Sequence, residues 1–292
     1  SINESVLLCP GTYVVENNNT VFINLTGNDA NSVFDCDGAY INGQRDDWDY
    51  SSLKTGDGQP TGINVFEGYG AVQNCMIYYF ITGISLSTAS NTNLTNVTLE
   101  GYGAGNSGIS LSSGNFTLNN VDVWGYTDSL LEIQEYAGAN GLSISNSYFN
   151  CNQSYSNYDC VNINLPSYAV NIENTEFIVD GGLASIFSLN TSNFESDNVT
   201  FEGFGSEVSG YVASYSPLNV SGRICDGGMG YVMFGVGGDE SAFISSDGES
   251  IADSLIDGSE NISAFCLDLS GFGADDNATF YFASDIDCSF IE

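Results

Sequence analysis

Histidine is absent from this 292-residue chain, and Lys and Arg together number only 3. Without histidine, neither a Ser-His-Asp triad nor a Cys-His nucleophile can form. Asp and Glu number 37, which gives a formal net charge of −34 at pH 7. A chain with this much negative charge repels nucleic acid and anionic lipid. We therefore expect neither as a partner. We expect salt, divalent cations or acid to screen the charge.

Long hydrophobic runs are also missing. No stretch of 18 apolar residues occurs, so the sequence predicts no membrane span. Charged residues make up only 14% of the chain, whereas hydrophobic residues make up 42%, enough for a packed core. The chain is long enough for one large domain, or for one domain with a smaller one attached.

Neither a Cys-x-x-Cys motif nor a Cys/His cluster is present, so no such metal site is predicted. Candidates for disulfides are Cys36, Cys75, Cys151, Cys160, Cys225, Cys266 and Cys288. Their connectivity cannot be deduced from sequence alone, although a disulfide between Cys151 and Cys160 would close the long loop between them.

Candidates for glycosylation, as Asn-x-Ser/Thr acceptors, are Asn3, Asn18, Asn24, Asn93, Asn115, Asn152, Asn190, Asn219, Asn261 and Asn277. Cysteines and acceptors together favour an extracellular protein at the cell surface.

A repeat runs through the chain, marked by one asparagine in each copy. The marker occurs at Asn74, Asn96, Asn120, Asn146, Asn174 and Asn198, with spacings of 22, 24, 26, 28 and 24 residues. The residue three positions after each marker is large and apolar, and the residue two positions before it is apolar in five of six copies. About ten residues before several markers lies a Gly-Ile pair, as at Gly62, Gly83 and Gly108.

The apolar alternation changes phase at each marker. Before the marker, the inward-facing residues lie four and two positions upstream of it. After the marker, they lie one and three positions downstream, whereas an uninterrupted strand would place them at the marker and two positions downstream. The chain therefore turns at the Asn, which tolerates the left-handed conformation of a tight corner. Stacked on successive coils, the six side chains can hydrogen-bond into a ladder. Asn96 and Asn198 are also glycosylation acceptors, and we expect them to be buried at the corner and unmodified.

Short β segments, a fixed corner and a period of 22–28 residues predict an all-β solenoid, a right-handed parallel β-helix. A leucine-rich repeat would need the LxxLxLxxN/C pattern and a helical repeat a 3.6-residue period, and neither occurs. The sequence repeat ends after residue 225. We therefore expect the parallel β-helix and its N-terminal cap in residues 1–225, and a small C-terminal β-domain or cap in residues 226–292.

Two segments, "DCDGAYINGQ" (35–44) and "GINVFEGYGAVQNCMIYYFITGISL" (62–86), resemble the pectin-lyase-like right-handed parallel β-helix superfamily. Within it they are most similar to secreted archaeal β-helix repeat surface proteins, and the resemblance covers about residues 20–225. It implies that Cys36 and Cys75 lie on adjacent coils, as a disulfide or as two stacked buried thiols. It implies little about activity, because this scaffold hosts lyases, hydrolases, adhesins and structural proteins.

The catalytic groups that the resemblance implies are missing. Lyases of this superfamily use a basic residue, commonly Arg, with Ca²⁺ held by acidic residues. Here Arg45, Lys54 and Arg223 do not stand beside an acidic cluster on a regular coil. A carboxylate pair alone could hydrolyse glycosides, and the candidates are Asp35 with Asp37 or a pair among Asp46, Asp47 and Asp49. The first two suit a turn better, and the other three suit a solvated loop. We predict no catalytic residue.

No cofactor and no dedicated metal site are predicted. Acidic segments at 45–49, 237–240 and 273–278 offer oxygen ligands for Ca²⁺, but none has the spacing of an EF-hand loop. Surface carboxylates in so acidic a chain need no ligand to explain them, and Ca²⁺ binding stays an open alternative.

The sequence therefore predicts a non-catalytic extracellular structural protein that self-assembles into a cell-surface filament, sheath or layer. An open alternative is a surface adhesin or carbohydrate-binding protein with surface glycans as partners. Extra aromatic residues at 75–80 and 124–126 would either stack along the coils or form a face for sugars. A polysaccharide lyase or glycoside hydrolase is a third alternative, disfavoured by the missing catalytic groups.

Overall fold

The structure is a computed structural model that describes part of the chain. The described residues are 4–14, 21–26, 31–43, 61–66, 70–87, 91–101, 107–112, 114–126, 129–134, 141–152, 160–180, 183–204, 207–214, 219–226, 230–236, 239–245, 261–262 and 280–281. After residue 199 only the backbone is described.

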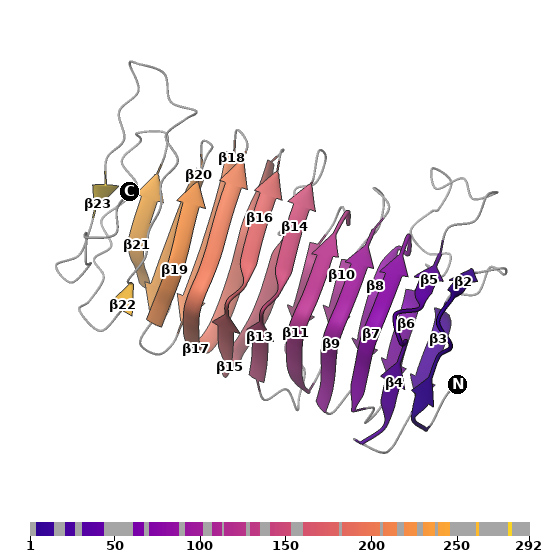
Figure 1. The fold of residues 1–292 in the computed structure, drawn as a ribbon. Helices are drawn as coiled ribbons and strands as arrows, with labels where there is room; N and C mark the ends of the chain where they lie inside the picture. The colour runs from indigo at the N-terminus through magenta and orange to yellow at the C-terminus, as the bar shows by residue number, and fades with distance from the viewer. Residues whose placement is uncertain are drawn as a thin grey trace.

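Parallel strands stacked coil upon coil make up most of the described structure, as the sequence predicts (Figure 1). The described residues contain strands and no α-helix. The strands form three sheets, which we name by their place relative to the Asn corner.

The pre-corner sheet lies before the Asn of each coil. In stacking order it contains β1 (Val6–Leu7), β4 (Val33–Asp35), the starts of β7 (Ala71–Tyr78), β9 (Asn91–Glu100) and β11 (Asn115–Trp124), then β13 (Gly141–Ser145), the end of β15 (Val161–Glu173), the middle of β17 (Leu183–Phe204), the start of β19 (Asn219–Asp226) and β22 (Asn261–Ile262).

The post-corner sheet follows the Asn. It contains β2 (Thr12–Val14), β5 (Tyr40–Asn42), the ends of β7, β9 and β11, then β14 (Tyr148–Asn152), β16 (Glu176–Asp180) and the ends of β17 and β19.

The third sheet closes each coil. It contains β3 (Val21–Thr26), β6 (Thr61–Phe66), β8 (Thr82–Ser87), β10 (Ser107–Leu111), β12 (Ser129–Gln134), the starts of β15 and β17, β18 (Glu207–Ser214) and β20 (Gly230–Val236), followed by β21 (Asp239–Ser245) and β23 (Phe280–Tyr281).

The core lies inside the coils, in columns of apolar side chains in register. The pre-corner column includes Phe34, Val72, Leu94, Leu118, Ile144 and Ile172, and the post-corner column includes Ile41, Ile77, Leu99, Val123, Phe149 and Phe177. Every one of these side chains is buried. Neighbouring rings stack within a column, with the Phe149 and Phe177 centroids 5.1 Å apart. The predicted change of phase at the Asn is thus confirmed, because both columns face one interior.

A column of glycines, Gly62, Gly83 and Gly108, brings successive coils close together where the third sheet begins. A Cβ atom on Gly62 would lie 2.7 Å from the carbonyl oxygen of Gly83. One on Gly83 would lie 2.7 Å from the carbonyl oxygen of Gly108. These distances are too short for a Cβ, so the Gly of each repeated Gly-Ile pair permits a close approach of backbones.

Parallel stacking continues one strand beyond the predicted boundary at residue 225. Strand β20 still pairs in parallel with β18, whereas β21 pairs antiparallel with β20 and β23 pairs antiparallel with β21. These last strands lie at the opposite end of the solenoid from β2 and β3 (Figure 1). The solenoid therefore runs at least to Val236, and the division into two domains stays a prediction.

Candidate functional site

The Asn corner joins the pre-corner and post-corner sheets. All six marker asparagines, Asn74, Asn96, Asn120, Asn146, Asn174 and Asn198, have positive φ values, between 47° and 56°. This is the left-handed region, which is costly for most L-residues and which Asn and Gly enter most readily. The backbone at each marker therefore turns between two strands.

Hydrogen bonds between marker side chains run along the outside of this corner. Asn96 Nδ2 donates to Asn74 Oδ1 at 2.8 Å, and Asn120 Nδ2 donates to Asn96 Oδ1 at 2.9 Å. Asn198 Nδ2 donates in the same way to Asn174 Oδ1 at 2.8 Å. Each amide thus links one coil to the coil before it.

The ladder is interrupted between these two runs. Asn146 Nδ2 donates to Asn119 Oδ1 at 2.9 Å, so its partner is the residue before the expected Asn120. Asn174 Nδ2 donates to Glu173 Oε1 at 3.2 Å. Sequence reasoning did not identify Asn119 as a partner, although the doublet of two asparagines at this corner is a visible signal for one.

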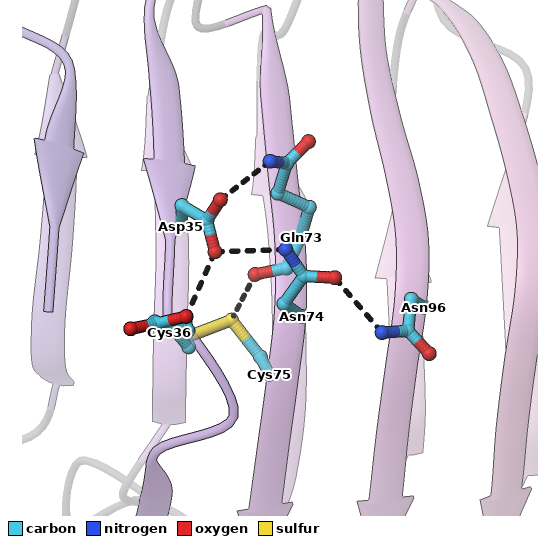
Figure 2. The surroundings of a disulfide bond; sticks show 7 residues. Asp35, Cys36, Gln73, Asn74, Cys75 and Asn96 are labelled. Carbon is cyan, nitrogen blue, oxygen red and sulfur yellow. Dashed lines mark hydrogen bonds between the residues drawn. A yellow bond between two sulfur atoms is a disulfide. The ribbon is translucent and has the colours of Figure 1, made fainter. Parts of the chain in front are cut away.

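Asp35 begins the ladder at its N-terminal end (Figure 2). Its Oδ1 accepts from Asn74 Nδ2 at 2.9 Å and from the backbone N–H of Asp37 at 2.8 Å, while its Oδ2 accepts from Gln73 Nε2 at 2.6 Å. Burial alone would raise the pKa of Asp35, but these three hydrogen bonds outweigh it and the pKa is lowered. A carboxylate held ionised in this way lacks the raised pKa of a glycosidase general acid, and Asp35 instead holds the turn by accepting the backbone N–H of Asp37.

Asp35→Asn should lower stability most at neutral pH. Because the pKa of Asp35 is lower in the folded protein than in the unfolded chain, ionised Asp35 stabilises the fold at pH values above its unfolded-state pKa of about 4. This stabilisation is lost as the pH falls through the folded-state pKa. The difference between wild type and variant should therefore shrink below about pH 4. Urea denaturation at a series of pH values measures it. Asp37→Asn is the control, because it removes one charge from the same turn and keeps a residue that tolerates positive φ; an equal pH response in both variants would contradict this role for Asp35.

Asn96 and Asn198 are exposed, so our expectation that they are buried is wrong. The residues flanking the corner, such as Leu94 and Val97, point inward and fill the core. The Asn between them therefore lies along the outer surface of the coil, with its amide used in the ladder. A glycan on Nδ2 of Asn96 would remove a donor hydrogen from that nitrogen, so the ladder and the modification compete at this atom.

Asn96→Ala should lower the free energy of unfolding by about 2 kcal/mol, because Ala pays the left-handed penalty and the ladder is cut. Asn96→Gly should recover about 1 kcal/mol of that loss, since Gly adopts positive φ freely. Urea denaturation of glycan-free protein measures both. Asn93→Ala, at an exposed position on the same strand, should stay within about 0.5 kcal/mol of wild type. Equal losses for Ala and Gly at position 96 would show that the backbone conformation is not the cause.

The other glycosylation candidates are distributed over the sheets. Asn93 and Asn115 are exposed on the pre-corner sheet, where Asn115 Nδ2 donates to Asn91 Oδ1 at 2.8 Å. Asn24 on β3 accepts from Asn64 Nδ2 at 3.0 Å. Only the backbone is described for Asn152, Asn190, Asn219 and Asn261, while Asn3, Asn18 and Asn277 lie outside the described residues. Glycosylation itself stays a prediction.

Two disulfides join cysteines of the described coils. Cys36–Cys75 connects adjacent coils beside the start of the ladder, with Cα atoms 4.9 Å apart (Figure 2). Cys151–Cys160 closes the loop between β14 and β15, with Cα atoms 5.9 Å apart. All four cysteines are buried, whereas Cys9 is free and exposed. Cys225 is described as backbone only, and Cys266 and Cys288 lie outside the described residues.

Among the described residues, no group of three or more Cys, Asp or Glu could hold a metal ion. Of the acidic segments considered for Ca²⁺, 45–49 and 273–278 lie outside the described residues, as do Arg45 and Lys54, and Arg223 is described as backbone only. In the same part of the chain there is no helix of the length and apolar character that a membrane crossing requires.

The outer face of the post-corner sheet carries aromatic side chains. The rings of Tyr40 and Tyr78 stack with centroids 5.5 Å apart at an angle of 15°, and the ring of Tyr79 lies 6.2 Å from that of Tyr78. Tyr40 is 47% exposed. Burial, with smaller effects from Tyr40, Glu100 and Tyr79, raises the pKa of Tyr78. The stacking predicted as one alternative for these aromatics is present, and it occurs on the outer surface.

No protein-family model, curated protein or solved structure matches this chain. The parallel β-solenoid therefore rests on the strand register described above. What the protein does has to be argued from its own residues.

Proposed function

We propose that this protein is a non-catalytic extracellular structural protein, a subunit that self-assembles through its N-terminal end into a cell-surface filament, sheath or layer. The observation that carries this proposal is the partial burial of most described inward side chains of the first coil, with Leu25 the fully buried exception. The inward side chains Val6, Tyr13 and Ile23 pack on the core but are only partly buried. Their partners on the second coil, Phe34 and Ile41 among them, are fully buried. Further residues stacked on this coil would bury these side chains, and in this proposal a second copy of the chain supplies them.

The strands of the first coil also present open edges. Within the described residues, β1, β2 and β3 each pair with one neighbour only, namely β4, β5 and β6. An unpaired strand edge is a template for a strand of another chain. Leu7, at 67% exposure, and Val14, at 48%, add apolar surface to the same coil.

The distribution of charge favours a second copy as the occupant of this end. Residues 1–34 contain three acidic side chains, about one in eleven, whereas residues 226–292 contain fourteen, about one in five, and neither segment contains Lys or Arg. Two C-terminal ends would repel each other, but the N-terminal end can receive one at much lower electrostatic cost. Such a head-to-tail contact is heterologous, and repeated along the solenoid axis it generates a filament.

Several features support the remaining parts of the proposal. Two disulfides are typical of an oxidising, extracellular environment. The resemblance to secreted archaeal β-helix surface proteins agrees with this location. The complete absence of histidine and the hydrogen-bonded state of Asp35 argue against hydrolytic chemistry.

Electron microscopy and sedimentation of the native protein test the proposal, in high salt with Ca²⁺ and again at low pH. We expect filaments or sheets from wild type and monomers from Leu7→Gln/Val14→Glu. The matched control Phe66→Glu changes an exposed apolar residue of the second coil and should leave assembly intact. Monodisperse wild-type monomers in every condition would overturn the proposal. Closed dimers linked through Cys9 would overturn the head-to-tail contact, because they require two N-terminal ends to meet.

A further inference from the structure

We infer that the outer face of the post-corner sheet binds an extended, uncharged polysaccharide. The site is a row of side chains in register on successive coils, Tyr78, Glu100, Trp124 and Asn150, flanked by Tyr40 and Tyr79. Inward neighbours in the same strands, such as Leu99 and Val123, are buried, so the row faces outward. This inference goes beyond self-assembly and does not depend on it.

The spacing of the row suits a polysaccharide chain. Adjacent strands lie about 4.8 Å apart, so Tyr78 and Trp124, which are two coils apart, are separated by roughly 10 Å along the sheet. This is about the length of a disaccharide unit in an extended polysaccharide. Trp124 can therefore cover one sugar ring, and Tyr78, which has one face stacked on Tyr40, can contact another with its remaining surface. Glu100 between them can accept hydrogen bonds from hydroxyl groups.

The next position of the row carries an acceptor without a partner. Asn150 Nδ2 donates to the hydroxyl oxygen of Tyr148 at 2.9 Å, whereas Asn150 Oδ1 is buried and accepts no hydrogen bond from the described residues. Buried polar atoms usually have a partner, so a water molecule or a ligand hydroxyl is the expected donor to Asn150 Oδ1. A sugar hydroxyl in line with Trp124 would supply it after a small movement of the side chain.

Tyr79 adds an independent indication. Its φ is +63°, although the residues that follow Glu100 and Trp124 on the next coils are Gly101 and Gly125, and Gly125 also has a positive φ. A bulky residue in the left-handed region costs about 1–2 kcal/mol, and such strain clusters at functional sites. The chain therefore tolerates a strained tyrosine where glycine would fit, beside the ring of Tyr78.

Charge selects the class of polysaccharide. Glu100 and Asp122 lie on this face, and the whole chain carries a formal charge of −34. A polyuronate would be repelled, whereas hydroxyl groups of a neutral polymer can donate to these carboxylates. The face therefore fits a neutral glucan, xylan or mannan in preference to an acidic polymer.

Affinity electrophoresis of the native protein in gels containing hydroxyethyl cellulose, xylan, mannan or polygalacturonate tests the inference. We expect retardation by at least one neutral polymer and none by polygalacturonate. Trp124→Ala should weaken binding by about ten-fold, given what an aromatic contact contributes. The matched control is Trp48→Phe, a position outside the described residues. In the Trp48→Phe variant, Trp124 is the one remaining tryptophan, so its fluorescence can report binding.

Three further variants separate loss of binding from loss of folding and from loss of assembly. Trp124→Leu replaces Trp124→Ala if the latter fails to fold, as judged by circular dichroism. Tyr79→Gly relieves the left-handed strain but loses ring packing and increases the entropy of the unfolded chain, so it should change stability by no more than about 1 kcal/mol and still weaken binding. Leu7→Gln/Val14→Glu should bind normally as a monomer, so failure of assembly and failure of this site are distinguishable. No retardation by any neutral polymer, or equal retardation of wild type and the Trp124 variant, would overturn the inference.

Discussion

Gly83→Ala lowers the free energy of unfolding by about 3 kcal/mol, the expected cost of forcing a methyl group into a fully packed contact. The added Cβ would lie 2.7 Å from the carbonyl oxygen of Gly108 and 2.6 Å from the hydroxyl oxygen of the buried Tyr126. The first of these is backbone and cannot rotate away, so adjacent coils have to separate. Urea denaturation followed by circular dichroism measures the loss.

Ser85→Ala is the matched control for this prediction. Ser85 lies on the same strand, points outward and pairs in register with Ser110 on the next coil. Its replacement should change the free energy of unfolding by no more than about 0.5 kcal/mol. If Gly83→Ala were as mild as the control, the close approach of coils along the glycine column would be refuted.

Removing the Cys36–Cys75 disulfide by replacing both cysteines with Ala should cost about 4 kcal/mol. The bond spans 39 residues, and cross-linking a loop of that length removes a corresponding entropy from the unfolded chain. The Cys151–Cys160 disulfide spans only 9 residues, so its removal should cost about 2.5 kcal/mol. Denaturation of the two double variants under non-reducing conditions gives the comparison. A larger loss from the shorter loop would contradict loop entropy as the main cause.

The corner could be predicted from sequence because it is a local property. The phase of the apolar residues shifts at Asn74, Asn96 and each later marker, and a side chain that tolerates positive φ stands at every shift. Both facts lie within a few residues of chain. The same local reading could not show that the marker side chains are exposed, because that depends on which way the corner projects from the packed coil.

The site on the post-corner face could be predicted only in part. Aromatic residues near 75–80 and 124–126 are visible in the sequence, but nothing there shows that Tyr78 and Trp124 share one row. Coil lengths vary between markers, so lateral neighbours follow from strand register and not from a constant spacing. The partners Gln73 and Asn119 were missed for the same reason, since each bonds across coils.

The sequence by itself determined the class of fold, because alternation, period and corner residue are short-range patterns that only a solenoid of parallel strands satisfies together. It also excluded histidine-dependent chemistry, since composition alone decides that. Tertiary structure decided the interruption of the ladder, the need for glycine at position 83, the partly covered core of the first coil and the aromatic row. Each of these depends on distances between coils that are remote in the chain, which only packing of the whole solenoid sets.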